Sequence, residues 1–196
     1  MNARLKALLA GTALTIVVAF GPELHAQLQL NPFSALYDNV ARAAKLNDAN
    51  LVRSLLGNGG NPNQLDDQGR AGLHYAAMNG NEPIILFLVK DGAKLDPKDK
   101  IGNTPLHLAA DSNQVEAAKL LLDLGAPVDP ENKNGMTPLM IAANRGNVEI
   151  VQALLAKGAS VTKTDYTGRD AAGWAAESHR PAVVQAIKRA QTAKKS

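Results

Sequence analysis

The sequence contains no cysteine, and aromatic residues make up only 4% of its 196 positions. Without cysteine the chain forms no disulfide, thiolate metal site, cysteine nucleophile or lipid-modified cysteine. This absence does not by itself identify a compartment, because a protein can be exported without disulfides. Hydrophobic residues amount to 45% of the chain and are mostly alanine and leucine. That composition favours closely packed helices over an aromatic-rich β-sandwich.

The chain also lacks a strong excess of charge. Its formal net charge is +3, whereas a nucleic-acid-binding protein needs positive charge clustered on one face. Most of the excess lies at the two ends of the chain, in Arg4, Lys6, Lys188, Arg189, Lys194 and Lys195. We therefore expect no nucleic-acid partner.

Residues 1–26 have the order of a secretory signal peptide. Two positive charges precede an uncharged apolar run at 7–20, which Gly21 and Pro22 interrupt. The run is shorter than the roughly 20 apolar residues that a membrane-spanning helix needs. The sequence therefore predicts cleavage after Ala26.

We expect the mature chain to be exported, with the bacterial periplasm favoured and full secretion as the alternative. A short segment at 27–33 would precede the folded domain. An uncleaved membrane anchor stays open, because Leu24 is an imperfect residue near the cleavage site. Beyond the signal peptide we expect no contact with a membrane.

The rest of the chain repeats itself every 33 residues. Four glycines mark the period: Gly69, Gly102, Gly135 and Gly168. Paired alanines keep the same step from Ala43-Ala44 to Ala175-Ala176. A fixed period of this size indicates stacked supersecondary units, each of which buries its apolar faces against its neighbours.

The unit at 99–131 shows how each repeat folds. Gly102 suits a turn with positive φ, Thr104 can cap a helix, and Pro105 fits the first helical turn. Asn113 tolerates the left-handed turn that separates this helix from a second one at about 115–124. The sequence thus predicts two short helices per unit.

The chain resembles the ankyrin repeat family. The resemblance rests on Thr104–Ala110, Thr137–Ala143 and Leu73–Ala77, and on glycine-alanine pairs such as Gly125-Ala126 that close each unit. It implies an all-α ankyrin-repeat solenoid of about five helix-turn-helix units joined by β-turn or hairpin loops.

The repeat domain is expected at 34–190, followed by a frayed tail at 191–196, with Asn31 or Ser34 capping the first helix. The outer units depart from the motif, as expected where one face of the array meets water. The units are expected at about 34–65, 66–98, 99–131, 132–164 and 165–190.

The sequence offers little for catalysis. The mature chain has three histidines, of which His74 and His107 hold equivalent repeat positions and His179 a turn position. The resemblance implies that His74 and His107 form structural hydrogen bonds between units. We expect no enzyme, no metal and no cofactor, with a metal or catalytic role for the two histidines as the alternative.

Residues with a structural role in the repeat are Gly69, His74, Gly102, Thr104, Pro105, His107, Gly135, Thr137, Pro138 and Gly168.

The resemblance also implies a protein partner, bound on the concave face formed by turn tips and first helices. Candidates there are Arg70, Met78, Lys100, Ile101, Asn103, Lys133, Met136, Arg145, Tyr166 and Arg169. Among them Ile101, Met136 and Tyr166 are expected as apolar tips, and Arg70, Arg145 and Arg169 as an arginine row. Aromatic residues, methionine and arginine are enriched in interface cores, although single exposed apolar residues are also ordinary.

We therefore interpret the chain as an exported, monomeric, non-enzymatic scaffold that binds a partner protein. One alternative is an accessory or inhibitory subunit that regulates a single envelope enzyme. Another is a membrane-anchored adaptor, which applies if the signal peptide is not cleaved.

Overall fold

A computed structural model describes residues 39–193 of the chain. These residues form ten α-helices and no strand, so the prediction of an all-α fold is confirmed for this part of the chain. Three expectations lie outside the described residues: the signal peptide at 1–26, the segment at 27–33, and the first helix cap at Asn31 or Ser34.

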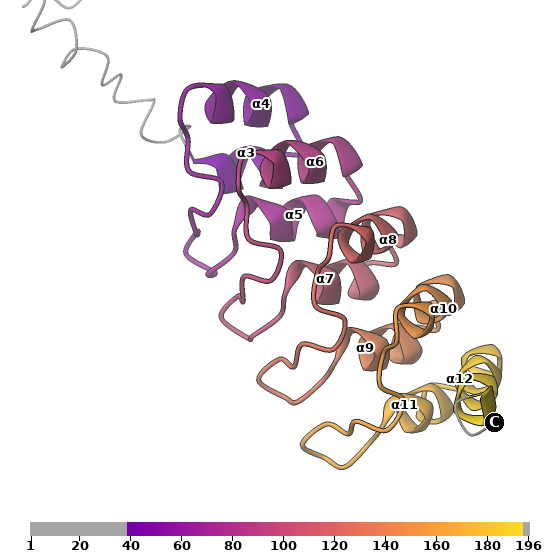
Figure 1. The fold of residues 1–196 in the computed structure, drawn as a ribbon. Helices are drawn as coiled ribbons and strands as arrows, with labels where there is room; N and C mark the ends of the chain where they lie inside the picture. The colour runs from indigo at the N-terminus through magenta and orange to yellow at the C-terminus, as the bar shows by residue number, and fades with distance from the viewer. Residues whose placement is uncertain (1–38, 194–196) are drawn as a thin grey trace, which may run out of the picture. The chain divides into compact units, whose positions relative to one another are not determined.

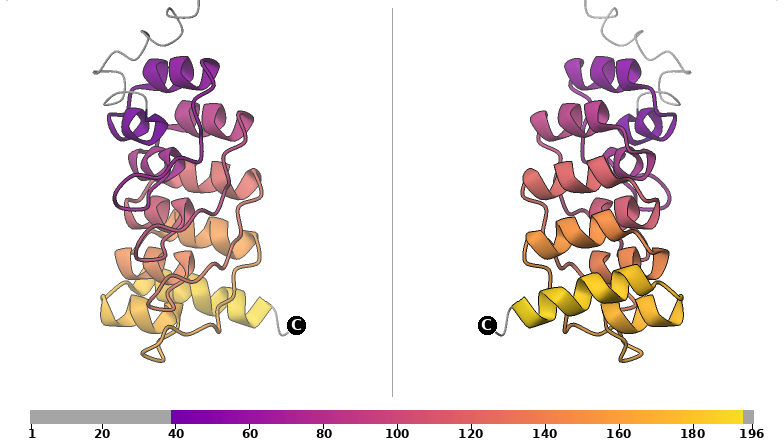
Figure 2. Two further views of the ribbon diagram at one scale, coloured as in Figure 1. Left: turned by 90° about the vertical axis from the view of Figure 1, so that its left-hand side faces the viewer. Right: turned by 90° about the vertical axis from the view of Figure 1, so that its right-hand side faces the viewer.

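The ten helices alternate between an inner row and an outer row (Figure 1). The inner row contains α3 (Val40–Lys45), α5 (Gly72–Asn79), α7 (Pro105–Asp111), α9 (Pro138–Arg145) and α11 (Ala171–Glu177). The outer row contains α4 (Ala49–Gly57), α6 (Glu82–Lys90), α8 (Val115–Asp123), α10 (Val148–Ala156) and α12 (Pro181–Ala193). Neighbouring helices within each row pack side by side, as both views in Figure 2 show. Four long loops project from the side of the inner row (Figure 1).

Each of the four loops folds around one aspartate or asparagine. In the loop before α7, Oδ1 of Asp99 accepts the backbone N–H of Ile101 at 3.1 Å and that of Asn103 at 2.8 Å. Gly102 has φ +83°, and a Cβ atom added there would lie 2.8 Å from the backbone nitrogen of Lys133. Glycine is therefore required both by the positive φ and by the close approach of the next loop. Positive φ recurs at Gly69, Gly135 and Gly168.

The inner helices begin at the residues that the sequence indicates. Thr104 and Thr137 have extended backbones at the N-caps of α7 and α9, and Pro105 and Pro138 follow them. The missing N–H of proline costs nothing in the first helical turn, where it would have no helical partner. Asn47, Asn113 and His179 adopt positive φ in the turns between inner and outer helices.

The core lies between the two rows of helices. The inner helices contribute alanine pairs, such as Ala109 and Ala110, which have no exposed surface and let the rows approach closely. The outer helices contribute fully buried aliphatic side chains, including Leu88, Leu121 and Leu154. Because isolated helices of this length are unstable in water, each unit depends on its neighbours for stability.

The last helix continues further than the sequence predicts. α12 spans 13 residues and reaches Ala193, so 191–193 are helical, although a frayed tail was expected at 191–196. Val183 and Ile187 are buried on its inner side and attach it to the array. No helix within residues 39–193 is long and apolar enough to cross a membrane.

Candidate functional site

The tips of the four loops form one continuous surface. They lie at 67–68, 100–101, 133–134 and 166–167, and all eight side chains, which we call the loop-tip surface, are exposed. The backbone N–H of Lys133 donates to the carbonyl oxygen of Ile101 at 3.1 Å. The same bond recurs at the other junctions, from Lys100 to Gln68 and from Tyr166 to Asn134. These bonds fix the register of the loops, so side chains of consecutive tips lie side by side.

Aromatic side chains hold the first and last of these loops. The hydroxyl of Tyr75 donates to Oδ2 of Asp66, and the indole Nε1 of Trp174 donates to Oδ2 of Asp165 at 3.1 Å. Burial tends to raise the pKa of Asp165, but hydrogen bonds from Thr167 and others outweigh it, and the pKa is lowered. These contacts are not among the predictions from the sequence, although the nine-residue spacing from aspartate to aromatic residue is a visible signal.

His107 connects two consecutive units. Its Nδ1 accepts the backbone N–H of Thr104 at 3.1 Å, so Nε2 carries the proton and donates to the carbonyl oxygen of Met136 at 3.0 Å. His74 makes the equivalent bonds with Ala71 and Asn103, both at 3.0 Å. Both ring nitrogens of each imidazole are thus engaged within the chain.

Burial keeps both imidazoles neutral, although their hydrogen bonds to the carbonyl oxygens of Met136 and Asn103 tend to raise the pKa. Burial lowers the pKa of His107 to about 4, and it also lowers the pKa of His74 below its usual value. A catalytic base or a metal ligand needs a free nitrogen lone pair, and neither histidine offers one. Among the described residues no group of three or more histidine, aspartate or glutamate side chains could hold a metal ion.

The structure divides the ten candidate partner-binding residues by exposure. Five are exposed: Lys100, Ile101, Lys133, Arg145 and Tyr166. Four are half-buried: Arg70, Met78, Met136 and Arg169. Ile101 is 57% exposed and Tyr166 is 75% exposed, which makes them the most accessible large apolar side chains of the loop-tip surface.

Two candidates have structural contacts that the sequence analysis did not foresee. Asn103 is only 9% exposed, because its side-chain oxygen accepts from Nδ2 of Asn132 at 2.8 Å and its carbonyl oxygen accepts from His74. Met136 is not an apolar tip, since its side chain packs partly buried against the core. We therefore remove Asn103 and Met136 from the candidate surface.

The expected arginine row is paired with acidic residues of the chain itself. Arg145 lies 2.7 Å from Asp111, and Arg169 lies 2.7 Å from Glu177. Arg70 lies 3.4 Å from the buried carboxylate of Asp99, and its guanidinium also lies over the ring of Tyr75. These arginines connect elements of the array and do not form an unpaired positive stripe.

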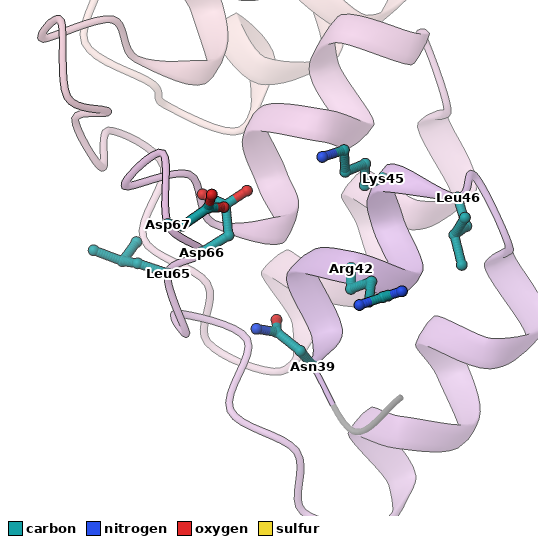
Figure 3. Close-up of a pocket in the computed structure, with 7 residues that line it drawn as sticks. All are labelled: Asn39, Arg42, Lys45, Leu46, Leu65, Asp66 and Asp67. Atoms are coloured by element: carbon teal, nitrogen blue, oxygen red, sulfur yellow. The ribbon is translucent and has the colours of Figure 1, made fainter. Parts of the chain in front are cut away.

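A pocket of about 680 Å³ lies between α3 and the loop before α5 (Figure 3). Its lining combines both signs of charge with two leucines: Asn39, Arg42, Lys45, Leu46, Leu65, Asp66 and Asp67. Lys45 also lies 5.6 Å from the centre of the Tyr75 ring. Among the described residues that line the pocket, none is a histidine, serine or threonine.

Comparison with known families accounts for this architecture. The family model for ankyrin repeats, which spans three copies of the repeat, matches residues 40–132 and 124–195. The two matches together cover all ten described helices, and ankyrin repeats generally mediate protein–protein interaction. The chain therefore belongs to the ankyrin repeat family.

Proposed function

We propose that this chain is a non-enzymatic scaffold that binds a partner protein on its concave face. The contact would be made by the loop-tip surface and the exposed ends of the inner helices. The observation that carries the proposal is the exposure of Ile101 and Tyr166 on loops that hydrogen bonds hold in register. Large apolar side chains on an ordered surface act as anchors in protein interfaces.

The mechanism is recognition by a surface that is already ordered. The loops are fixed by internal aspartate turns, by backbone bonds between tips and by the two histidine connections. Binding therefore costs little conformational entropy on this side of the interface. Arg145 and Arg169 would contribute at the rim, where their internal ion pairs limit any gain in affinity.

We further propose that the protein acts after export, in the bacterial periplasm or outside the cell, as a monomer. The charged, apolar and small-residue order of residues 1–26 supports export. Mass spectrometry of the purified protein tests this step, because cleavage gives a mature chain that begins at Gln27. Retention of Met1 on membrane-bound protein would favour the anchored adaptor instead.

An affinity capture tests the binding proposal. The protein is used as bait in an envelope extract, together with a variant that carries Ile101→Ser and Tyr166→Ser. A control variant carries Leu86→Ser, which removes an exposed apolar side chain from α6 on the outer row. We expect a partner that the wild type and the control retain and that the double variant loses.

The alternative outcomes are also informative. A single partner at fixed stoichiometry that is an enzyme would favour the accessory or inhibitory subunit. A partner that the double variant retains would contradict binding through the loop-tip surface.

A further inference from the structure

We propose that the loop-tip surface binds an acidic protein segment that also carries aliphatic or aromatic side chains. This inference rests on the proposed function and adds the chemistry of the partner. It depends on two lysines and two apolar residues that occupy adjacent positions on the three tips from 100–101 to 166–167.

Two lysines lie at the centre of this surface. Lys100 and Lys133 hold the same place in consecutive tips, and both side chains are exposed. Neither forms an ion pair with a carboxylate in the part of the chain that the structure describes. Like charges on neighbouring loops repel each other, and a carboxylate between them would relieve that repulsion.

Three of the neighbouring acidic residues are already engaged. Asp99 is buried and accepts the backbone N–H groups of its own loop. Glu131 pairs with Lys163 at 2.6 Å, and Asp111 pairs with Arg145 at 2.7 Å. Asp67 on the adjacent tip is exposed, but it forms no ion pair with Lys100 among the described residues. A carboxylate placed between Lys100 and Lys133 is therefore expected from a partner.

The apolar residues depart from the pattern of the other tips. Ile101 stands where the equivalent positions carry polar residues, namely Gln68, Asn134 and Thr167. Tyr166 stands where the other tips carry charged residues, namely Asp67, Lys100 and Lys133. A solvated tip needs neither side chain, whereas an interface uses both as anchors.

The ring of Tyr166 is supported from beneath. A Cβ atom added at Gly135 would lie 2.7 Å from the ring carbon Cδ1 of Tyr166, so the ring packs directly on the backbone of the preceding loop. The residue is nevertheless 75% exposed. An aromatic ring that is fixed on one side and open on the other binds an apolar group with little loss of freedom.

The acidic segment is expected to leave the first tip uncovered. Asp67 is exposed there and carries the opposite charge from Lys100 on the adjacent tip. The acidic segment is therefore expected to cover the loop-tip surface from Lys100 to Tyr166. Replacing Asp67 with serine is expected to leave affinity unchanged or to strengthen it, because the substitution removes a repulsive charge.

Selection from a phage-displayed library of random peptides tests the chemistry. The probes are the wild-type protein, a Lys100→Ser and Lys133→Ser variant, and an Ile101→Ser and Tyr166→Ser variant. All the changed side chains are exposed, and circular dichroism with thermal melting verifies that each variant folds. Selected peptides are then synthesised, and their affinity is measured by fluorescence anisotropy at two salt concentrations.

We expect peptides that combine glutamate or aspartate with leucine, phenylalanine or similar residues. Loss of both lysines should weaken their binding roughly tenfold, as expected for two exposed charge pairs near the upper end of their usual strength. Added salt should weaken binding to the wild type more than binding to the lysine variant. A Lys100→Glu and Lys133→Glu variant should instead select basic peptides.

The outcomes separate this inference from the proposed function. Peptides without acidic residues that still require Ile101 and Tyr166 would overturn the acidic preference and leave the binding surface in place. Peptides indifferent to all four side chains, or no enrichment at all, would overturn both.

Discussion

His107 and His74 act as neutral connectors between units, each with both ring nitrogens bonded to backbone groups. At the equivalent position of the next unit the chain has Met140, which is buried and contributes only packing. The polar connection therefore runs from the second unit to the fourth, and the junction with the last unit depends on other contacts. One of these is the bond from the Ser178 hydroxyl to the side chain of Asn144.

The stability of the array should fall as the pH drops below about 6.5. The folded-state pKa of His107 is lowered to about 4, whereas the unfolded residue titrates near 6.5. The unfolded chain thus takes up a proton that the folded chain excludes. Each such proton lowers the free energy of unfolding by about 1.4 kcal/mol for each pH unit below 6.5. The contribution of neutral His107 to the free energy of unfolding is fully present above pH 6.5 and is lost as the pH falls to about 4.

Urea unfolding monitored between pH 7.5 and pH 5 measures this loss. The range avoids most carboxylate titration, so the histidines dominate it. A His107→Gln variant is the control, and its stability should depend less steeply on pH. An identical pH dependence in the variant and the wild type would contradict the role given to His107.

Side-chain partners were the hardest feature to foresee from the sequence. The repeat predicts Arg145 near the end of a first helix, but its pairing with Asp111 depends on the stacking of α9 against α7. The burial of Asn103 likewise depends on a neighbouring unit, because Asn132 of the next loop donates a hydrogen bond to it. Contacts between residues 29 to 34 positions apart follow from the stacking geometry, which local sequence patterns do not specify.

At the level of secondary-structure elements, the helices and loops followed closely from the sequence. Glycine, proline and capping residues mark the turns and helix starts through backbone rules that act within a few residues. The extent of α12 was the exception. Its last residues carry no stop signal such as glycine or proline, and Ile187 anchors the preceding turn in the core.

Two glycines allow a matched test of how the loops pack. Gly102 and Gly168 both have φ +83°, but an added Cβ would lie 2.8 Å from a backbone nitrogen at Gly102 and would meet nothing within 4 Å at Gly168. Gly168→Ala should cost about 1–2 kcal/mol for the left-handed backbone alone. Gly102→Ala should cost more, because the loops must also separate. If urea unfolding shows that the two variants lose equal amounts of unfolding free energy, the loop tips are not in close contact.

At the level of the whole molecule, deletion of residues 99–131 should preserve the fold. In the shortened chain His74 would meet the carbonyl oxygen of Met136 as His107 does now, and Lys133 would donate to Gln68 as Lys100 does now. The helical circular dichroism signal per residue should therefore persist. Stability should fall, because one set of interfaces between units is lost. Loss of the helical signal would contradict a modular array.

Photo-crosslinking in living cells tests whether the loop-tip surface binds a partner protein. A photoreactive amino acid replaces Tyr166 in one strain and Leu86 in another. Both positions are exposed, but Tyr166 lies on a loop tip whereas Leu86 lies on α6 of the outer row. We expect a discrete protein adduct from position 166 and none from position 86. An adduct from position 86 alone, or none from either in folded protein, would contradict binding through this surface.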